Sequence, residues 1–569
     1  MRRPVLALLI SLTAAAVPPA RAQPAPSPGA CVLGSTQATL DIGDVEARIF
    51  NTGSLFYGKG SGDHYLVPKA AGRSPVYAAG LWVGGRVGGQ LRVAGGTYGG
   101  PPTSGMDFTF WPGPLGPDAR PANPTDCSAY DRIYTVSRPD VLRYNETSRA
   151  TDDLRDWPYT LGAPVLDGDG DPSNYNLAGG DQPAIRGDQM TWSLTNDVGN
   201  VHPAQNTPPL GIELRTEAIA FALGRLDQTT VYRYTITNRT SATIDSVYAG
   251  LFADPDIGDG VDDYVGTDTT RGMAFMYNAD NQDGTGDGTT YGVAPPAVGF
   301  QVLEGPVGLP NGRDDDRDGT ADEPGERLGL TASSYFRNAA GGVAISSPND
   351  GVELYRYLRG RWADGSVRRE FGNGYRQTQG AGTPFAYAGD PVTGRAWSEV
   401  NPGTGSPNAP GGRQMMVSTG PFRLEPGQSE IVTFAIPYGR GTTNLASITA
   451  LRRAALAVTS AFEAGYFEPQ RIGEITPLPI DQAVRLGAPS PNPFSARAVV
   501  RYAMPTGTRL RATLIDVLGR EIAVLADGPT TATEGEIAVD GAGLAPGVYR
   551  VRVVVPGAER FVTLVRMGR

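Results

Sequence analysis

The sequence contains few of the residues on which hydrolytic enzymes most often depend. Only two histidines occur among its 569 residues, His64 and His202, and no G-x-S-x-G motif is present. These histidines exclude an H-E-x-x-H zinc hydrolase and make a histidine-based catalytic triad an unfavourable interpretation. A glycosidase needs only two carboxylates on one cleft, so that class stays open. The 59 acidic residues give no basis for choosing such a pair.

Basic residues are also scarce relative to acidic ones. Lysine occurs only at Lys59 and Lys69, and every other basic residue is arginine. The chain has 49 basic and 59 acidic side chains; without the three arginines of the first 22 residues the counts are 46 and 59, a net charge of −13. This charge makes nucleic acid a poor partner, because phosphate backbones bind basic surfaces.

The first 22 residues have the parts of a secretory signal peptide. Arg2 and Arg3 form a basic start, Val5–Val17 is apolar but too short to span a bilayer, and Ala20-Arg21-Ala22 is an A-x-A cleavage site. The pattern predicts a signal peptide over 1–22, followed by a disordered segment over 23–38. No later segment reaches the length of a membrane span, so no transmembrane segment is predicted.

Cysteine occurs only twice, at Cys31 and Cys127. An exported chain enters an oxidising compartment, where an even number of cysteines favours a disulfide between them. Two free buried thiols are the alternative.

Glycine and proline are abundant, with 76 and 48 residues, which indicates many turns and loops. The clearest strand signal is Glu213–Asp256, where three runs have alternating apolar faces. Asn444–Phe462 has the one apolar stripe at helical spacing. These patterns predict a β-rich body over 39–469, with an optional break into two sub-domains near residue 200, and a linker over 470–486.

Residues 487–569 alternate short apolar runs with turn clusters, which predicts a small antiparallel Ig-like β-sandwich. The predicted fold class is therefore mainly β: a large multi-strand β-sandwich body with one late α-helix, followed by this small sandwich. Three motifs occur in order in the last segment: NPF, DVLGRE and LAPGVYRVRV. Their marker positions are Asn492, Pro493, Phe494, Asp516, Gly519, Arg520, Gly547 and Tyr549.

With these motifs, the segment resembles the type A C-terminal sorting domain of the bacterial type IX secretion system. It is also similar to the Ig-like domain of flagellar hook-capping proteins. One departure is Arg560, near the place where the family usually has lysine. The resemblance implies export by the Sec and then the type IX machinery, to the medium or the outer cell surface of a Gram-negative bacterium. Surface glycan is a further implied partner.

Stretches of the body, among them AAGLWVGG, FWPGPL and YRYTITNRT, resemble a recurrent family of secreted proteins that carry such a sorting domain. This resemblance implies no particular activity. We expect a non-enzymatic structural or adhesive protein; the alternative is a carbohydrate-binding or glycoside-cleaving extracellular protein. Tyr355, Tyr357 and Trp362 could line a sugar platform, although a strand packed in the core would show the same residues.

Acidic loops are the strongest sign of chemistry. Asn311–Glu326 contains a D-x-D-x-D-G run, and alternate acids on a tight turn suit calcium, which takes six to eight oxygen ligands. The predicted calcium ligands are Asp314, Asp316, Asp318 and Asp322. No helices flank the loop and Gly325 stands where an EF-hand has its closing Glu, so it is not an EF-hand. A second predicted calcium set, Asp254, Asp256 and Asp259, follows a strong strand, in a run that also contains Asp262 and Asp263. Asp167, Asp169 and Asp171 form a weaker set. A solvated acidic loop is the alternative for each set.

Overall fold

The structure is a computed structural model that describes residues 34–567 apart from short gaps. The gaps are 58–64, 99–109, 122–126, 200–201, 203–205, 223, 285–289, 311, 313, 315–319, 338–343, 473–484, 488, 505–508, 517–519, 531–533 and 556–557. The predicted signal peptide therefore lies outside the described residues. The first strand begins at Gln37, inside the segment 23–38 that was expected to be disordered.

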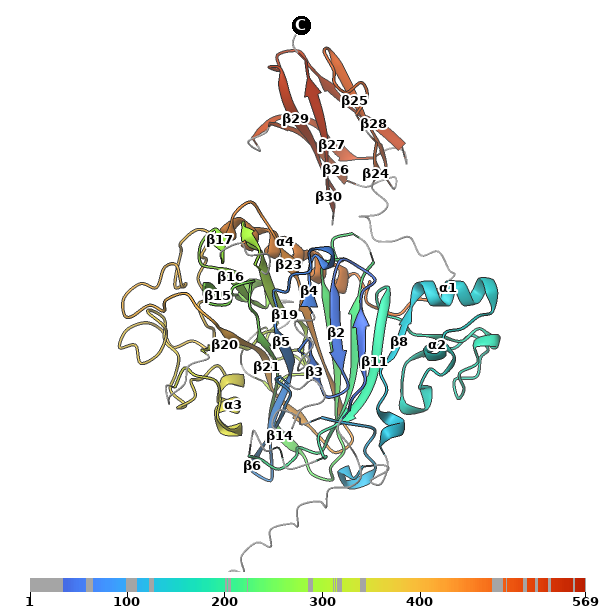
Figure 1. Ribbon diagram of the computed structural model, residues 1–569, viewed down its shortest axis with the longest axis vertical. Helices are drawn as coiled ribbons and strands as arrows, with labels where there is room; N and C mark the ends of the chain where they lie inside the picture. Colours follow the sequence, from blue (N-terminus) through green and yellow to red (C-terminus); the bar gives the residue numbers. More distant parts are fainter. Residues whose placement is uncertain are drawn as a thin grey trace, which may run out of the picture.

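The body is built on two large antiparallel β-sheets, with two small two-stranded sheets beside them (Figure 1). In spatial order, the first sheet contains β1 (Gln37–Leu40), β2 (Glu46–Phe50), β3 (Ser54–Leu55), β5 (Ala78–Val87), β14 (Ile244–Asp254), β21 (Gln414–Leu424) and β20 (Ala332–Phe336), with β4 (Tyr65–Leu66) on β2 and β6 (Gln90–Gly95) on β5. The second contains β15 (Asp263–Asp268), β16 (Met273–Asn278), β19 (Ala297–Glu304), β22 (Ser429–Ile436), β13 (Thr230–Asn238), β12 (Ile212–Ala220), β11 (Gln189–Asn196) and β7 (Trp111–Pro112), with β23 (Tyr438–Gly439) on β19 and β8 (Tyr134–Ser137) on β11.

The three strand runs predicted over Glu213–Asp256 form β12, β13 and β14, but they do not make one three-stranded sheet. β12 and β13 pair along their whole length in the second sheet, while β14 lies in the first, between β5 and β21. The turn after Asn238, where the Thr240 N–H donates to the Asn238 side chain, therefore carries the chain across to the other sheet. The optional break near residue 200 would fall between β11 and β12, which pair directly.

The main hydrophobic core lies between the two sheets. It combines buried side chains such as Leu251 and Val417 of the first sheet with Leu214, Tyr232 and Phe434 of the second. Successive residues of a strand point to opposite faces, so each central strand also supplies side chains to its outer face. The predicted fold class is confirmed: the chain is mainly β, with a multi-strand sandwich body.

The predicted late helix is present as α4 (Asn444–Glu463), and the Thr443 side chain caps its first turn. Ile448, Leu451 and Ala455 pack on Phe275 and Tyr277 of β16, while the alternate β16 residues face the core between the sheets. By length and composition α4 is the one helix of the described chain that could cross a membrane. In this structure its apolar face covers the outer face of the second sheet.

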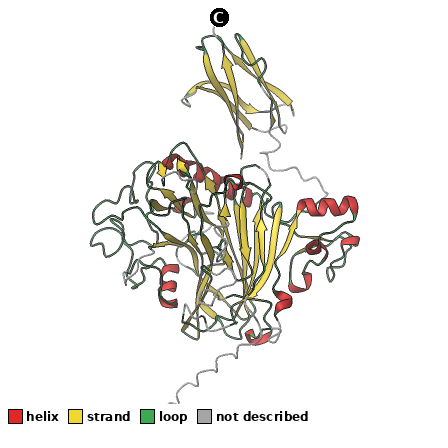
Figure 2. Ribbon diagram, in the orientation of Figure 1, coloured by secondary structure: helices red, strands yellow, loops and turns green. Residues whose placement is uncertain are grey.

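The expectation of a single helix was incomplete, because three shorter helices also occur at the edges of the body (Figure 2). They are α1 (Arg138–Thr147), α2 (Asp152–Arg155) and α3 (Gly351–Leu358). Each starts after a side chain that accepts a hydrogen bond from a first-turn N–H, namely Ser137, Thr151 and Asp350. These caps are readable in the sequence, whereas the helices are too short to show a clear apolar stripe.

Short single turns of 3-10 helix complete the body. They are η1 (Lys69–Ala71), η2 (Pro117–Ala119), η3 (Ser128–Tyr130), η4 (Tyr159–Leu161), η5 (Leu177–Gly179) and η6 (Thr269–Arg271).

The C-terminal residues form a second, smaller sandwich with its own core, as the sequence predicted. One sheet contains β24 (Arg485–Leu486), β25 (Arg497–Ala503) and β28 (Glu534–Asp540). The other contains β27 (Glu521–Pro529), β26 (Arg509–Asp516), β29 (Gly547–Val555) and β30 (Ala558–Arg566). Phe494, Val500, Leu514, Ile537 and Val551 are buried between the sheets.

Two leucines of α4 give a matched test of its packing. Leu451 is fully buried, while Leu456 is 56 % exposed. Leu451→Ala should lower the free energy of unfolding by about 2–5 kcal/mol because it leaves a cavity against the sheet. Leu456→Ala should change it by less than about 0.5 kcal/mol. Urea unfolding of the mature protein measures both, and equal effects would contradict the packing of α4 on the second sheet.

Candidate functional site

A pocket of about 460 Å³ opens on the outer face of the first sheet, beside the N-terminus of α3. This volume falls within the range of about 300–1,000 Å³ that is common for small-ligand sites. The pocket is lined by Tyr57, Tyr77, Trp82, Thr97, Tyr98, Phe252, Asp254, Phe336, Ser347, Pro348, Asp350, Leu354 and Gln414.

Aromatic rings from three strands of the first sheet are buried directly beneath the pocket. Trp82 of β5 stacks on Phe252 of β14, with ring centroids 4.9 Å apart and planes within 1° of each other. Phe336 of β20 continues the stack at 6.1 Å from Phe252. The indole fits because β6 has glycine beside it: a Cβ atom at Gly95 would lie 2.6 Å from the Trp82 ring.

The acid of the pocket is Asp254, the last residue of β14. Tyr98 donates a hydrogen bond from its hydroxyl to Asp254 Oδ2 at 2.7 Å, and the Gln414 side-chain amide contacts the same hydroxyl. Burial raises the pKa of Asp254 to about 6, against the lowering effect of the Tyr98 and Gln414 hydrogen bonds. Burial and the Asp254 charge likewise raise the pKa of Tyr98, so this hydroxyl stays a donor.

A second carboxylate, Asp350, also lines the pocket, but it already has a structural role. Its side chain accepts the Glu353 N–H at 2.9 Å and thereby caps α3. Among the described residues that line the pocket there is no lysine or arginine. The described lining therefore combines part-exposed tyrosines with hydrogen-bond acceptors, an arrangement that suits a neutral polyhydroxylated ligand.

Tyr355, Tyr357 and Trp362, for which the sequence left a sugar platform or a core position open, are core residues. Tyr355 and Tyr357 lie on α3, and they and Trp362 are at most 4 % exposed. The hydroxyl of Tyr357 donates to the Ser346 carbonyl at 2.6 Å, and the Trp362 indole donates to the Gly374 carbonyl at 2.9 Å. The aromatic residues that do line the pocket come from separate strands and loops, so no sequence pattern groups them.

The predicted calcium loop is described only in part. Asp316 and Asp318 lie outside the described residues, so the structure does not place the D-x-D-x-D set as a whole. Both carboxylate oxygens of Asp322 accept the Gly312 N–H, at 3.0 and 2.8 Å, and the Asp322 N–H donates to Glu326 at 2.7 Å. These bonds close the loop, and calcium binding by Asp314–Asp322 stays a prediction.

The second predicted calcium set is divided between two environments. Asp254 faces the pocket, whereas the Asp259 N–H donates to the Asp283 carboxylate at 2.8 Å. Among the described residues, no group of three metal-ligating side chains within 4.8 Å of one another includes Asp254, Asp256 or Asp259.

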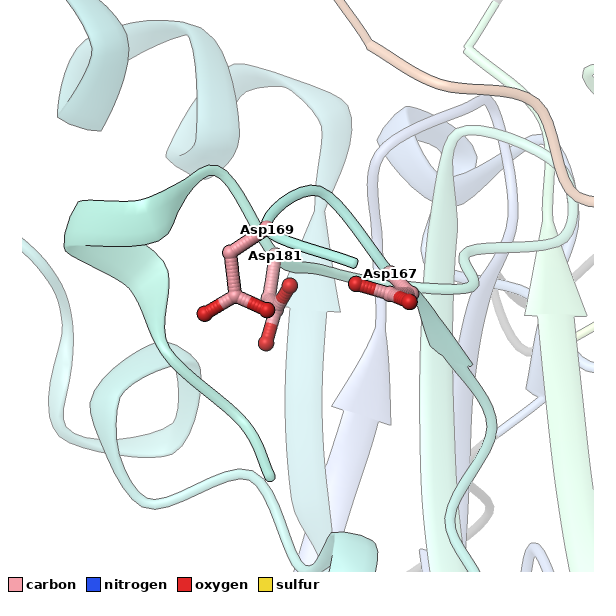
Figure 3. A group of neighbouring side chains, drawn as sticks. All are labelled: Asp167, Asp169 and Asp181. Atoms are coloured by element: carbon pink, nitrogen blue, oxygen red, sulfur yellow. The ribbon is translucent and has the colours of Figure 1, made fainter. Parts of the chain in front are cut away.

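The structure does bring together Asp167, Asp169 and Asp181, whose ligand atoms lie within 4.8 Å of one another (Figure 3). Asp167 and Asp169 follow β9 (Val165–Leu166), and Asp181 precedes its partner β10 (Gln182–Pro183). The sequence pattern had included Asp171, which instead accepts the Ser173 N–H, and it missed Asp181.

Hydrogen bonds within this loop already use the buried member of the group. The two oxygens of Asp181 accept the N–H groups of Gly168 and Asn176 at 2.7 and 2.6 Å. Asp169 accepts the Asn176 side-chain amide at 3.0 Å. The three carboxylates could hold a hard cation such as calcium, but their present contacts are those of a closed surface loop.

His202 is a buried structural residue. Its ring nitrogens lie 2.5 Å from the Val93 carbonyl and 2.7 Å from the Asp197 carbonyl. His64 lies outside the described residues. Cys127 is buried and disulfide-bonded, but Cys31 also lies outside them, so the predicted pair stays a prediction.

No protein-family model and no curated protein matches this chain. Among solved structures, a polysaccharide lyase is similar over 63 % of this chain, with 10 % sequence identity and a TM-score of 0.17. The matched region spans 34 % of that structure, about a third of its length. A similarity at this score supports no argument about fold or activity.

The contact between Tyr98 and Asp254 can be tested by removing one hydroxyl. Tyr98→Phe leaves the buried carboxylate without its closest donor, which should lower the free energy of unfolding by about 1–3 kcal/mol. Tyr159→Phe is the control, because this tyrosine is 37 % exposed. Thermal unfolding at pH 7 measures both variants. Equal melting temperatures would contradict the importance of this hydrogen bond.

Proposed function

We propose that this chain is an exported, non-enzymatic adhesion protein whose body binds a neutral glycan in the pocket on the first sheet. The observation that carries the binding proposal is the pocket itself, where the part-exposed rings of Tyr57, Tyr77 and Tyr98 line the same cavity as Asp254. Sugar rings present apolar C–H faces and hydroxyl edges, which match aromatic surface and hydrogen-bond acceptors respectively. The two carboxylates of the described lining would repel uronic or sulfated sugars.

The volume of the pocket limits the size of the ligand. At about 460 Å³ it suits a chain end, a branch or a short segment, but not a long stretch of polysaccharide.

We assign no catalytic residue. Glycoside cleavage needs an acid and a second carboxylate acting as nucleophile or base, and Asp350 is committed to capping α3.

The export proposal rests on the resemblance of the C-terminal segment to type IX sorting domains. The contacts of the motif residues are internal to this segment. Asn492 connects the start of the segment to β30 through two hydrogen bonds. Its side chain accepts the Val565 N–H at 2.8 Å and donates to the Thr563 carbonyl at 3.0 Å. Phe494 is buried in the small core. The first motif therefore stabilises the fold of the small sandwich.

The other two motifs also stabilise this unit. Asp516 and Arg520 close the turn between β26 and β27 through a 2.7 Å ion pair and a bond from the Arg520 N–H. The Tyr549 hydroxyl donates to the Ala545 carbonyl at 3.0 Å, in the manner of a tyrosine corner. Gly519 lies outside the described residues, and Gly547 begins β29.

A surface that secretion machinery could contact lies on the four-stranded sheet. Val548 pairs with Val565, and Arg552 pairs with Phe561 across β29 and β30. Val548, Phe561 and Val565 are 43, 48 and 37 % exposed. Exposed apolar side chains grouped on one face are typical of a protein-contact surface. Because the motif residues stabilise the fold of the small sandwich, we propose that the secretion machinery recognises this exposed face.

Glycan binding can be tested with the purified mature body. Asp254→Ala and Tyr77→Ala should each weaken binding of neutral oligosaccharides by at least about tenfold, because each removes a polar or stacking contact. Tyr159→Ala is the control, since this residue lies outside the pocket. A glycan array followed by calorimetry gives the affinities. Absence of any neutral glycan ligand would contradict the proposal, and turnover of a bound glycan would favour the glycoside-cleaving alternative.

Export can be tested in the native host. Removal of Pro491–Arg569 should leave the protein in the periplasm, because Sec export depends on the N-terminus alone. Phe561→Ser with Val565→Thr should reduce export while the unit still folds, and Arg501→Ser on the other sheet is the control. Normal amounts of the truncated protein outside the cell would refute the sorting role. Normal export of the double variant would refute only the proposed contact face.

A further inference from the structure

The loop that joins β14 to β15 concentrates negative charge where the chain passes from the first sheet to the second. It contains Asp256, Asp259 and Asp262, and Asp263 opens β15. The short hairpin of β17 (Gln282–Asp283) and β18 (Gly292–Val293) brings Asp283 against the same loop, because the Asp283 carboxylate accepts the Asp259 N–H.

Asp263 differs from the other acids of this loop because it is completely buried and only one of its two carboxylate oxygens has a hydrogen-bond partner. Its exposed fraction is 0 %. Oδ2 accepts the Ile257 N–H at 3.0 Å, but Oδ1 has no hydrogen-bond partner. Leaving a buried carboxylate oxygen without a partner is costly, and native proteins normally satisfy such an atom with a donor, a water molecule or a metal ion.

The charges that act on Asp263 are of its own sign. Burial is the main cause that raises its pKa, and the carboxylates of Asp262, Asp256 and Asp283 raise the pKa further. The buried Arg413 does not offset them, because its guanidinium pairs with Glu399 at 3.2 Å and donates to the Gly411 carbonyl at 2.9 Å.

Glycines allow the loop to close tightly around these carboxylates. A Cβ atom at Gly260 would lie 2.3 Å from Asp256 Oδ1, and one at Gly258 would lie 2.0 Å from Asp283 Oδ2. Gly258 also has a φ of +68°, which side-chain-bearing residues rarely adopt. The loop backbone therefore approaches these carboxylates more closely than a side-chain-bearing residue would allow.

We propose that a divalent cation of the calcium type binds at Asp263 Oδ1, with the Asp256 carboxylate as its second acidic ligand. The available donors are oxygens, which calcium prefers, whereas zinc would require histidine or cysteine. At most two of these carboxylates lie within ligand distance of each other, so carbonyls and water would complete the shell. Such a composition corresponds to a weak extracellular site, with a dissociation constant of about 0.1–1 mM.

The sequence run that holds the second predicted set already contains Asp263. In the structure Asp254 belongs to the pocket, and the site proposed here centres on Asp263 and Asp256. The site does not depend on the proposed glycan binding. Its role is to hold the crossing between the two sheets, where Asp263 is the first residue of the edge strand β15.

The experiment uses the mature full chain, stripped of metal, with Ca²⁺ as the probe. Asp169→Asn and Asp322→Asn form the background, so that the other acidic loops do not contribute. Calcium at 10 mM should raise the melting temperature by about 1–3 °C. It should also protect the 255–262 loop from limited proteolysis. Asp263→Asn in this background should lose the calcium-dependent shift and one bound ion by calorimetry.

The variants also distinguish a cation from a proton at Asp263. Without calcium, Asp263→Asn should melt no lower than its parent, because it removes a buried charge that has like-charged neighbours. Asp256→Asn tests the second ligand and keeps the core residue, and it should weaken calcium binding at least about tenfold. Asp280→Asn is the control, because Asp280 accepts the Gln282 N–H outside the proposed site. Calcium responses in Asp263→Asn and Asp256→Asn equal to that of the parent would overturn the proposal.

Discussion

The alternation of side chains along β14 is the constraint on which the body depends. This strand lies between β5 and β21, so it has hydrogen-bonding partners on both edges. Leu251 points into the core between the sheets, while Gly250, Phe252 and Asp254 point outward. A Cβ atom at Gly250 would lie 2.7 Å from Leu358, so α3 rests on the strand at that point. Beyond the part of β14 that α3 covers, Phe252 and Asp254 line the pocket.

Several buried acids of the body stabilise loops by accepting backbone N–H groups. Asp197 is buried and accepts three of them, from Leu210, Gly211 and Ile212. Asp181 and Asp283 each accept two. A carboxylate satisfied in this way stabilises a turn without any ion, so acidic residues close together in the sequence need not mark a metal site. Asp263, which is fully buried as well, differs from these three because its Oδ1 has no hydrogen-bond partner.

The sequence was informative where structure is set by local patterns. The strand runs of β12–β14, the capped stripe of α4 and the C-terminal sandwich were all predicted from apolar spacing. The sheet to which each strand belongs was not predicted, because β13 and β14 have similar sequence patterns and are separated only by the turn at Asn238. The pocket was not predicted either, since Trp82, Phe252 and Phe336 meet only through strand order. Tyr355 and Tyr357 were correctly weighed as core residues, although on a helix and not on a strand.

The two hydrophobic cores share no residue. Within the described chain, the clusters of the body end at Ile472 and that of the small sandwich begins at Leu486. Within the described residues, neither unit therefore contributes to the buried core of the other. A protease that cuts between them would release a body whose described apolar contacts are intact. In the proposed export role, removal of the small sandwich would be irreversible and would leave the stability of the body unchanged.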